Sequence, residues 1–81
     1  MNLIELLTPD KNHINANTIF INPEHIVSIT ISKEFNKMYW IYIYTIDDKC
    51  HKITRSKKCE MFESYDECMV FLKYKKILDN N

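Results

Sequence analysis

Two neighbouring stretches of alternating residues constrain the fold of this chain more than any other feature. In residues 25–32, HIVSITIS, apolar side chains alternate with hydroxyl side chains. Residues 38–46, MYWIYIYTI, are rich in β-branched and aromatic residues, and the short segment 33–37 separates them from the first stretch. A period of two with one apolar face is typical of a half-buried strand. The sequence therefore predicts two strands joined by a turn.

Further strands and one helix are predicted on either side of this pair. β-branched residues favour a strand that ends at Pro23, and the turn Asp47-Asp48-Lys49 favours a returning strand. Ser64 and Glu67 have the spacing of a capping box, in which each side chain bonds to the backbone N–H of the other residue. Residues 2–7 fit either a strand or a short helical turn, and we favour the strand. The predicted elements are strands at 2–7, 18–22, 25–32, 38–46 and 50–56 and a helix at 65–78, with a polar loop at 8–17 and a candidate short strand at 59–63.

The length of the chain limits this architecture to a single domain over residues 1–81. A chain of 81 residues has room for one hydrophobic core. We therefore predict an α+β fold in which a four- or five-stranded antiparallel β-meander carries one C-terminal α-helix packed on one face. No stretch approaches the ~18 uninterrupted apolar residues of a membrane span, and the N-terminus lacks the basic start of a signal peptide. We expect a cytoplasmic protein without membrane contact.

The chain contains no glycine, although average usage would supply about 7%. Loops that cradle phosphate need residues without a Cβ, so phosphate-binding and dinucleotide-binding loops are excluded. Turns that require a positive φ must use Asn or Asp instead. The scarcity of glycine, alanine and arginine, against ten lysines and twelve isoleucines, indicates an AT-rich genome, such as that of a low-GC bacterium or its phage. The candidates for a positive φ are Asn12, Asn15, Asn36, Asp47 and Asp48.

Alternation also assigns the strand residues to two faces of the sheet. One face carries three large aromatic side chains in a row, Trp40, Tyr42 and Tyr44, between a hydroxyl-bearing strand and a basic strand. Because Trp and Tyr dominate the energetics of protein interfaces, we predict that this face binds a protein partner. The alternative is that a second layer, such as residues 2–7, covers the rings as ordinary core. The face toward the helix is predicted to carry Val27, Ile29, Ile31, Tyr39, Ile41, Ile43 and Ile53.

The predicted helix has apolar side chains on more than one side. A surface helix normally carries one apolar stripe, and its other sides are polar. Three apolar residues here project away from the expected core stripe, so we predict that they support self-association as a homodimer. The core stripe is Tyr65, Cys68, Met69 and Leu72. The self-association residues are Val70, Tyr74 and Ile77.

Residues 49–58, KCHKITRSKK, hold five positive side chains and no acid. A basic hairpin beside a row of aromatic rings is similar to the stacking platforms of proteins that bind single-stranded nucleic acid. The overall pI of 6.8 counts against that function, because such domains are usually basic as a whole. Lysines that protect an edge strand from aggregation would account for the same residues. The candidate nucleic-acid-binding residues are Lys49, Lys52, Arg55, Lys57 and Lys58.

The sequence predicts no catalytic, metal or cofactor site. Zinc sites usually pair two cysteines two to four residues apart, whereas the cysteines here are nine residues apart and His51 adjoins only the first. We expect Cys50, Cys59 and Cys68 to be free thiols. No cysteine, serine or histidine belongs to a recognised nucleophile motif, so we expect a non-enzymatic protein without a cofactor.

Part of the chain resembles a known family. The small flagellar-operon proteins of the FlbD type, a swarming motility family, contain in the same order stretches similar to FINPEHIVSIT, MYWIYIYTIDDKCHKI and FESYDECMVFLKYKK. The resemblance spans residues 18–76 and rests on Asn22-Pro23, the isoleucine spacing and the Glu63-Ser64 helix start. It implies a sheet with one C-terminal helix and a non-enzymatic accessory role. The chain departs from the family at its polar loop, 8–17, and at Asp47-Asp48-Lys49, where the family usually carries glycine.

These features lead us to predict a small protein–protein interaction module, an accessory or inhibitory factor of a low-GC bacterium or its phage. The aromatic face is its predicted binding surface, and the partner is predicted to be a protein. Binding of single-stranded nucleic acid by the same aromatic residues and the basic segment 49–58 is the alternative function.

Overall fold

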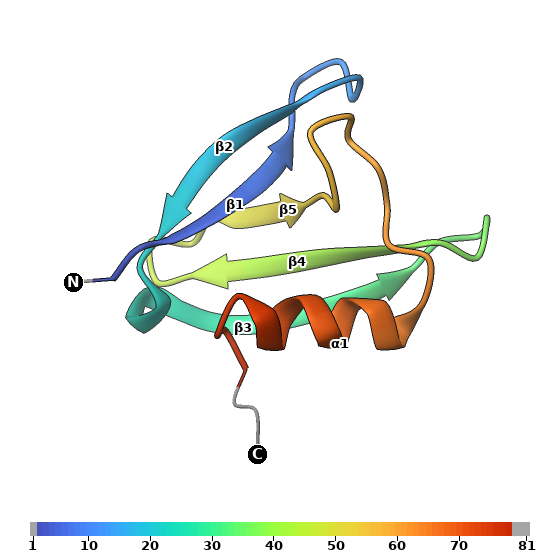
Figure 1. Cartoon of the computed structure of the whole chain (residues 1–81). Helices are drawn as coiled ribbons and strands as arrows, with labels where there is room; N and C mark the ends of the chain where they lie inside the picture. The colour runs from blue at the N-terminus through green and yellow to red at the C-terminus, as the bar shows by residue number, and fades with distance from the viewer. Residues whose placement is uncertain (1, 79–81) are drawn as a thin grey trace.

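The computed structural model describes residues 2–78 and contains five strands and one α-helix (Figure 1). β1 and β2 form an antiparallel hairpin, and β3, β4 and β5 form an antiparallel three-stranded sheet in that order. The α+β class, the antiparallel strands and the C-terminal helix are therefore confirmed, but the strands are divided between two sheets. None of the described helices is long and apolar enough to cross a membrane. The elements are β1 (Ile4–Pro9), β2 (Ala16–Ile21), the 3-10 turn η1 (Pro23–His25), β3 (Ile26–Lys33), β4 (Tyr39–Thr45), β5 (Cys50–Ile53) and α1 (Tyr65–Tyr74).

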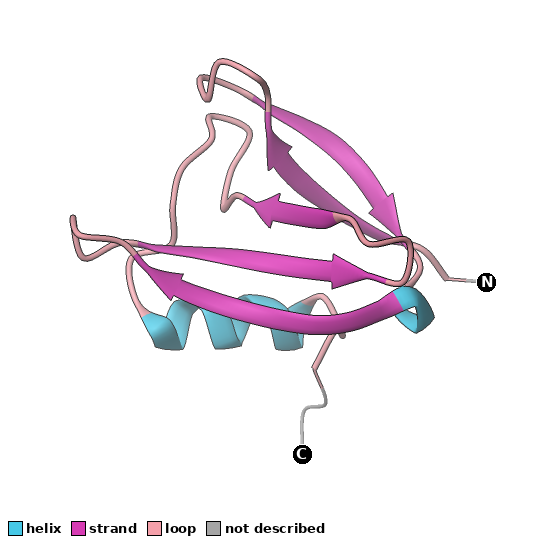
Figure 2. Ribbon diagram, turned by 180° about the vertical axis from the view of Figure 1, so that it is seen from behind, coloured by secondary structure: helices cyan, strands magenta, loops and turns pink. Residues whose placement is uncertain are grey.

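The two sheets are joined where β5 ends. The backbone N–H of Thr54 donates to the carbonyl of Leu7 in β1 at 2.8 Å, and the N–H of Ala16 donates to the carbonyl of Lys57 at 2.8 Å. Figures 1 and 2 show the consequence: the β1–β2 hairpin rises beside β5, while α1 lies along β3 and β4. The predicted strand at 50–56 stops at Ile53 because its backbone turns to bond with β1.

One hydrophobic core is shared by the hairpin, the three-stranded sheet and α1. Leu6 enters it from β1, and the Phe62 ring meets the Phe71 ring edge to face at 5.0 Å between centroids. Among the predicted helix-facing side chains, Ile41, Ile43 and Ile53 are fully buried in this core. The others except Val27 are half-buried and pack against it: Ile29, Ile31 and Tyr39. Its buried members are Leu6, Ile21, Ile41, Ile43, Ile53, Phe62, Cys68 and Leu72.

Val27 is 65% exposed, so its predicted place on the helix-facing side is wrong. Ile26 pairs with Thr45 and Ser28 pairs with Tyr44, which leaves Val27 as an extra residue between consecutive pairs. This is a β-bulge, and the extra residue shifts the alternation of β3 by one position. The predicted inward positions of Ile29 and Ile31 hold beyond the bulge, where both are half-buried against the core.

α1 begins as predicted and ends earlier than predicted. The Ser64 hydroxyl oxygen accepts a hydrogen bond from the Glu67 N–H at 3.0 Å. At the other end Lys76 adopts φ 62°, its N–H donates to the Lys73 carbonyl, and the Ile77 N–H donates to the Leu72 carbonyl. This is the Schellman pattern, with lysine at the left-handed position that is usually glycine.

Two predictions about the helix faces are wrong for reasons that follow from this geometry. The Schellman turn returns Ile77 to the core, where it packs as a half-buried side chain instead of projecting outward. Tyr65, predicted in the core stripe, is 53% exposed because it occupies the first helical turn at the margin of the sheet. Phe71 takes part in the core instead, although the predicted stripe omitted it.

Within residues 2–78, five turns place a residue other than glycine at a positive φ, and only Asp48 was among the predicted positions. The predicted Asn36 does not adopt a positive φ itself but precedes Lys37, which does. The Asn36 side-chain Oδ1 stabilises this turn by accepting a hydrogen bond from the Met38 N–H at 3.0 Å. Asp10 similarly accepts from the N–H of Asn12 and of Ile14. The residue inside each of these turns then takes the left-handed conformation. The five left-handed residues are His13, Lys37, Asp48, Cys59 and Lys76.

Candidate functional site

The predicted aromatic row lies on the outer face of the three-stranded sheet, away from the core. Trp40, Tyr42 and Tyr44 of β4 stand opposite the hydroxyl residues of β3. On the other side, Tyr42 pairs with Lys52 and Tyr44 pairs with Cys50 of β5. Because β4 is the central strand and carries no bulge in these pairings, alternation holds all three rings on one face.

Trp40 is only 7% exposed, so its ring is not part of the free surface. The Lys52 ammonium lies 4.6 Å from the centroid of the Trp40 ring and 5.9 Å from that of Tyr42. A cation over an aromatic face is attracted by the ring quadrupole, and the lysine stem adds apolar cover. Residues 2–7, the covering layer considered from sequence, contribute Leu6 to the core on the helix side instead.

The two tyrosines remain accessible, and Tyr44 is the more exposed at 39%. The pKa of the Tyr42 phenol is raised by partial burial and by the negative charge of Glu34. The pKa of the Tyr44 phenol is raised mainly by its hydrogen bond with the Cys50 side chain. Both phenols are therefore neutral across the physiological range and can donate a hydrogen bond to a bound molecule.

Exposed apolar side chains gather around Tyr44 at one end of the sheet. Val27, Tyr44 and Ile46 line a shallow groove of about 360 Å³. Ile46 also borders an adjoining groove of about 420 Å³, whose other exposed apolar wall is Phe20. We call the four side chains Phe20, Val27, Tyr44 and Ile46 the hairpin-end patch.

Sequence reasoning found only Tyr44 among the residues of the hairpin-end patch. Ile46 could have been predicted from the sequence, because it continues the every-second-residue spacing of Trp40, Tyr42 and Tyr44. Phe20 alternates with the core residue Ile21 and could have been assigned to an outer face in the same way. Val27 could not have been found, because its exposure depends on the bulge.

The predicted basic residues do not form a continuous surface. Lys49 lies at one end of β5, 3.9 Å from the Asp47 carboxylate, while Lys57 and Lys58 are exposed in the loop beyond the other end. Lys52 lies between them over the aromatic rings. An extended strand of nucleic acid would therefore meet these charges at separated points, and it would need to displace Lys52 to stack on Trp40.

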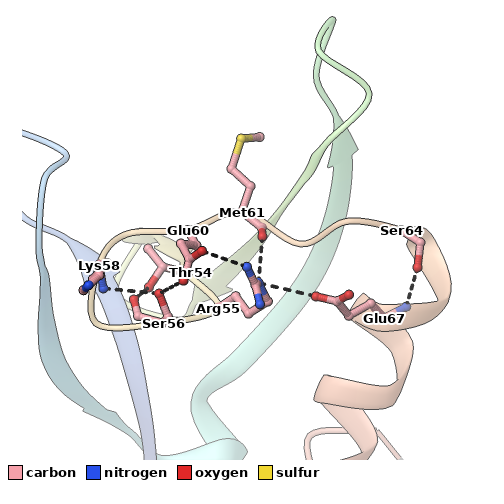
Figure 3. Close-up of polar contacts among 8 residues, drawn as sticks. All are labelled: Thr54, Arg55, Ser56, Lys58, Glu60, Met61, Ser64 and Glu67. Carbon is pink, nitrogen blue, oxygen red and sulfur yellow. Dashed lines mark hydrogen bonds and ion pairs between the residues drawn. The ribbon is translucent and has the colours of Figure 1, made fainter.

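Arg55 stabilises the loop after β5 instead of facing solvent as a free charge (Figure 3). Its guanidinium donates to the Glu60 carboxylate at 3.0 Å and to the Met61 carbonyl at 3.0 Å. It also lies 3.6 Å from Oε1 of Glu67 at the start of α1. The Glu67 carboxylate thus faces Arg55, and the reciprocal half of the predicted capping box is replaced by this ion pair.

The same loop contains a second set of hydrogen bonds. The Thr54 hydroxyl donates to the Ser56 carbonyl at 2.9 Å, and the Ser56 hydroxyl donates to the Glu60 carboxylate at 2.7 Å (Figure 3). The hydrogen bond from Ser56 and the charge of Arg55 lower the pKa of the Glu60 carboxyl. Glu60 is therefore ionised at neutral pH and serves as the acceptor of this loop.

The cysteines and histidines do not converge. Within residues 2–78, no three His, Cys, Asp or Glu side chains lie close enough together to hold a metal ion. Cys50 is exposed, Cys59 is half-buried and Cys68 is buried, and all three are free thiols. Burial, followed by the negative charge of Glu67, raises the pKa of the Cys68 thiol to about 11.

The outer side of α1 presents two of the three predicted self-association residues. Val70 and Tyr74 are strongly exposed, and Tyr74 borders an open groove of about 650 Å³ together with Leu3 and Lys75. The third, Ile77, packs on the core as described above. The remaining apolar surface of α1 is therefore smaller than the sequence predicted.

The comparisons with known proteins add no assignment. No protein-family model, no curated protein and no solved structure matches this chain. The similarity to FlbD-type proteins therefore stays a resemblance over residues 18–76, and the functional argument depends on the geometry of the site.

Proposed function

We propose that this protein is a small, non-enzymatic protein–protein interaction module that binds its partner through the outer face of the three-stranded sheet. It acts in the cytoplasm as an accessory or inhibitory factor of a low-GC bacterium or its phage. The observation that carries the proposal is the gathering of exposed apolar side chains around Tyr44 in the hairpin-end patch.

Surface apolar residues are normally scattered, so four exposed apolar side chains along two adjoining grooves require a reason. Interface hot spots are rich in aromatic side chains that combine apolar area with a hydrogen-bonding group. Tyr44 supplies both, since its ring is accessible and its phenol is neutral. Trp40 lies in the same row as the tyrosines with Lys52 over its ring, and we assign these two residues to supporting the face and not to direct contact.

Binding of single-stranded nucleic acid fits the geometry less well. Two of the five candidate cations, Lys49 and Arg55, lie within 4 Å of carboxylates, and a third, Lys52, covers Trp40. Of the five, only Lys57 and Lys58 are exposed at the same end of the molecule and lie outside the ion pairs found within residues 2–78. A stacking platform needs accessible ring faces beside a continuous basic track. The tyrosines are accessible, but the five cations lie at separated points and do not form such a track.

A tagged pull-down from the lysate of a low-GC bacterium tests the proposal when it compares three baits. The first is the wild-type chain, the second carries Tyr44→Asp with Ile46→Asp, and the third carries Val70→Asp with Tyr74→Asp on the exposed side of α1. We expect the wild-type chain and the α1 variant to capture the same stoichiometric protein. We expect the hairpin-end variant to lose it, because carboxylates in an apolar contact are not solvated in the complex.

All three baits must melt at similar temperatures for this comparison to count. Capture that survives in the hairpin-end variant would contradict the proposed surface. Recovery dominated by nucleic acid, and lost on Lys57→Glu with Lys58→Glu, would support the alternative function instead.

A further inference from the structure

β3 leaves one side of the three-stranded sheet open. It is the end strand of the order β3-β4-β5, and among the described residues no strand pairs with its other side (Figure 2). At eight residues it is also the longest strand. Natural edge strands usually avoid association through short length, proline or charged side chains. From Ile26 to Ser32, β3 has neither proline nor charge, and only Lys33 at its end is basic.

The hydrogen bonds of β4 show which backbone groups of β3 point to the open side. Tyr39 exchanges both of its backbone hydrogen bonds with Phe62, at 2.8 and 2.9 Å, and therefore directs its N–H and C=O away from β3. Backbone groups alternate along an antiparallel pair. Ser32, Thr30 and Ser28 consequently bond to β4, whereas Ile29 and Ile31 direct their N–H and C=O outward from the sheet.

The sequence of this edge is self-complementary. Ser28-Ile29-Thr30-Ile31-Ser32 reads the same in both directions. If two copies meet antiparallel about a twofold axis at Thr30, Ile29 of each copy stands opposite Ile31 of the other. Both residues present outward backbone groups, so they form hydrogen-bonded pairs with about four hydrogen bonds in total. Hydroxyl residues meet hydroxyl residues on the outer face, and Lys33 lies opposite Val27, so like charges do not meet.

An open groove lies along the same edge of the sheet. It measures about 430 Å³ and lies between β3, which contributes Ile29 and Ile31, and α1, which contributes Tyr65 and Met69. In the twofold arrangement the isoleucines of the second copy enter this groove on the helix side of the sheet. Tyr65, exposed at 53% in the single chain, is then covered.

We propose that this protein forms a homodimer in which β3 pairs antiparallel with β3 of a second copy about an axis at Thr30, making a continuous six-stranded sheet. An isologous contact of this kind uses the same patch on both copies and closes at two subunits. The proposal does not rest on the function proposed above, because it is argued from the edge of the sheet; the two surfaces meet at Val27, which belongs to the hairpin-end patch and lies at the end of the paired segment.

Sedimentation over a wide range of protein concentration tests the dimer. We expect wild-type protein to be dimeric at high concentration. Thr30→Lys places two ammonium groups directly across the axis, so we expect it to raise the dimer dissociation constant about tenfold or more while the melting temperature of dilute protein changes little. The matched control Thr18→Lys adds the same charge at an exposed position of β2 and should leave the dimer intact.

Cysteine cross-linking provides a second measurement if Thr30→Lys unfolds the chain. Residues directly opposite in a non-hydrogen-bonded pair have Cα atoms about 4.5 Å apart, within reach of a disulfide. In a Cys50→Ser, Cys59→Ser background, Thr30→Cys should give an oxidised dimer and Thr18→Cys should not. Wild-type protein that stays monomeric, a dimer lost only on Val70→Asp with Tyr74→Asp, or equal cross-linking at both positions would each overturn the proposal.

Discussion

The three thiols occupy three different environments, although each cysteine is nine residues from the next in the sequence. Cys68 belongs to the core, and burial raises its pKa to about 11 because a thiolate cannot be solvated there. Cys50 lies exposed on β5 beside Tyr44. The rate at which each thiol is chemically modified therefore reports on the burial of that one residue.

We predict that a thiol-specific reagent at pH 8 modifies Cys50 rapidly and leaves Cys68 unmodified in folded protein, because only a thiolate reacts and Cys68 is both protonated and buried. Mass spectrometry of the modified protein measures this, and Cys50→Ser should remove the fast phase.

The raised pKa of Cys68 also predicts how stability depends on pH. The unfolded chain releases the Cys68 proton near pH 9 and the folded chain holds it to about pH 11, so alkali should lower the free energy of unfolding over that interval. Rapid modification of Cys68 would contradict its place in the core.

Sequence alternation predicted the side of the sheet on which each aromatic ring lies, but not how exposed each ring is. Trp40 and Tyr44 have the same alternation, yet one is buried and the other is accessible. The difference comes from the neighbouring strand, which places Lys52 beside Trp40 and the shorter Cys50 beside Tyr44. Strand register determines these neighbours, and the period of a single strand does not contain that information.

At the scale of elements, one arginine connects the loop between β5 and α1 to the start of the helix. Arg55 reaches Glu60 and Met61 in the loop and Glu67 in the helix, which fixes the entry of the chain into α1. A planar guanidinium offers several donors in fixed directions, and a lysine ammonium cannot reproduce this set. The contacts are partly exposed, so their contribution to stability is moderate.

We predict that Arg55→Ala lowers the free energy of unfolding by about 1–2 kcal/mol, since hydrogen bonds to charged groups each contribute on that order before solvent screening. Arg55→Lys should recover less than half of the loss. Urea denaturation followed by circular dichroism measures both values. Lys57→Ala, a change at an exposed cation of the same loop, should stay within about 0.5 kcal/mol of the wild type, and an equal loss there would contradict a specific role for Arg55.

Element boundaries were predictable where a side chain marks them and were missed where the backbone alone decides. Ser64 marks the start of α1, and both the prediction and the structure begin the helix at residue 65. The end of α1 depends on Lys76 adopting a left-handed conformation, for which lysine gives no signal. The bulge at Val27 was likewise not predicted, because it depends on backbone pairing with β4 and valine is no signal for it.

At the scale of the whole molecule, the two sheets share one core and are expected to unfold together. Leu6 of β1 is buried among residues of β4, β5 and α1. The hairpin is further held by the Thr54–Leu7 and Ala16–Lys57 backbone hydrogen bonds. A hairpin of two strands is not stable by itself in water, so its structure depends on this docking.

We predict that Leu6→Ala lowers the free energy of unfolding by about 2–5 kcal/mol, the usual cost of truncating a fully buried leucine. Because the core is shared, the transition of Trp40 fluorescence should coincide with that of far-ultraviolet circular dichroism in wild type and variant. Leu3→Ala is the matched control on an exposed leucine of the same segment. Two separate transitions would contradict a single cooperative unit.

The sequence predicted the five strands, their antiparallel character and the C-terminal helix, but not the division into two sheets. The candidate strand at 59–63 was wrong, since that segment makes a single bridge between Phe62 and Tyr39. Every strand assignment rested on local period and turn residues, which act over a few positions. The division depends on Thr54 bonding to Leu7, forty-seven residues earlier in the chain. A contact at that separation is set by packing of the whole core and leaves no local pattern in either segment.

The five left-handed residues also have a consequence in the genetic code. Each carries a Cβ in a conformation that costs about 1–2 kcal/mol and that glycine would relieve. Codons for Asp48 and Cys59 become glycine codons by a single base change. Codons for His13, Lys37 and Lys76 need two changes, and every intermediate residue still carries a Cβ. Full relief of the backbone strain by glycine therefore needs two base changes at these three turns, whereas one change is enough at Asp48 and Cys59.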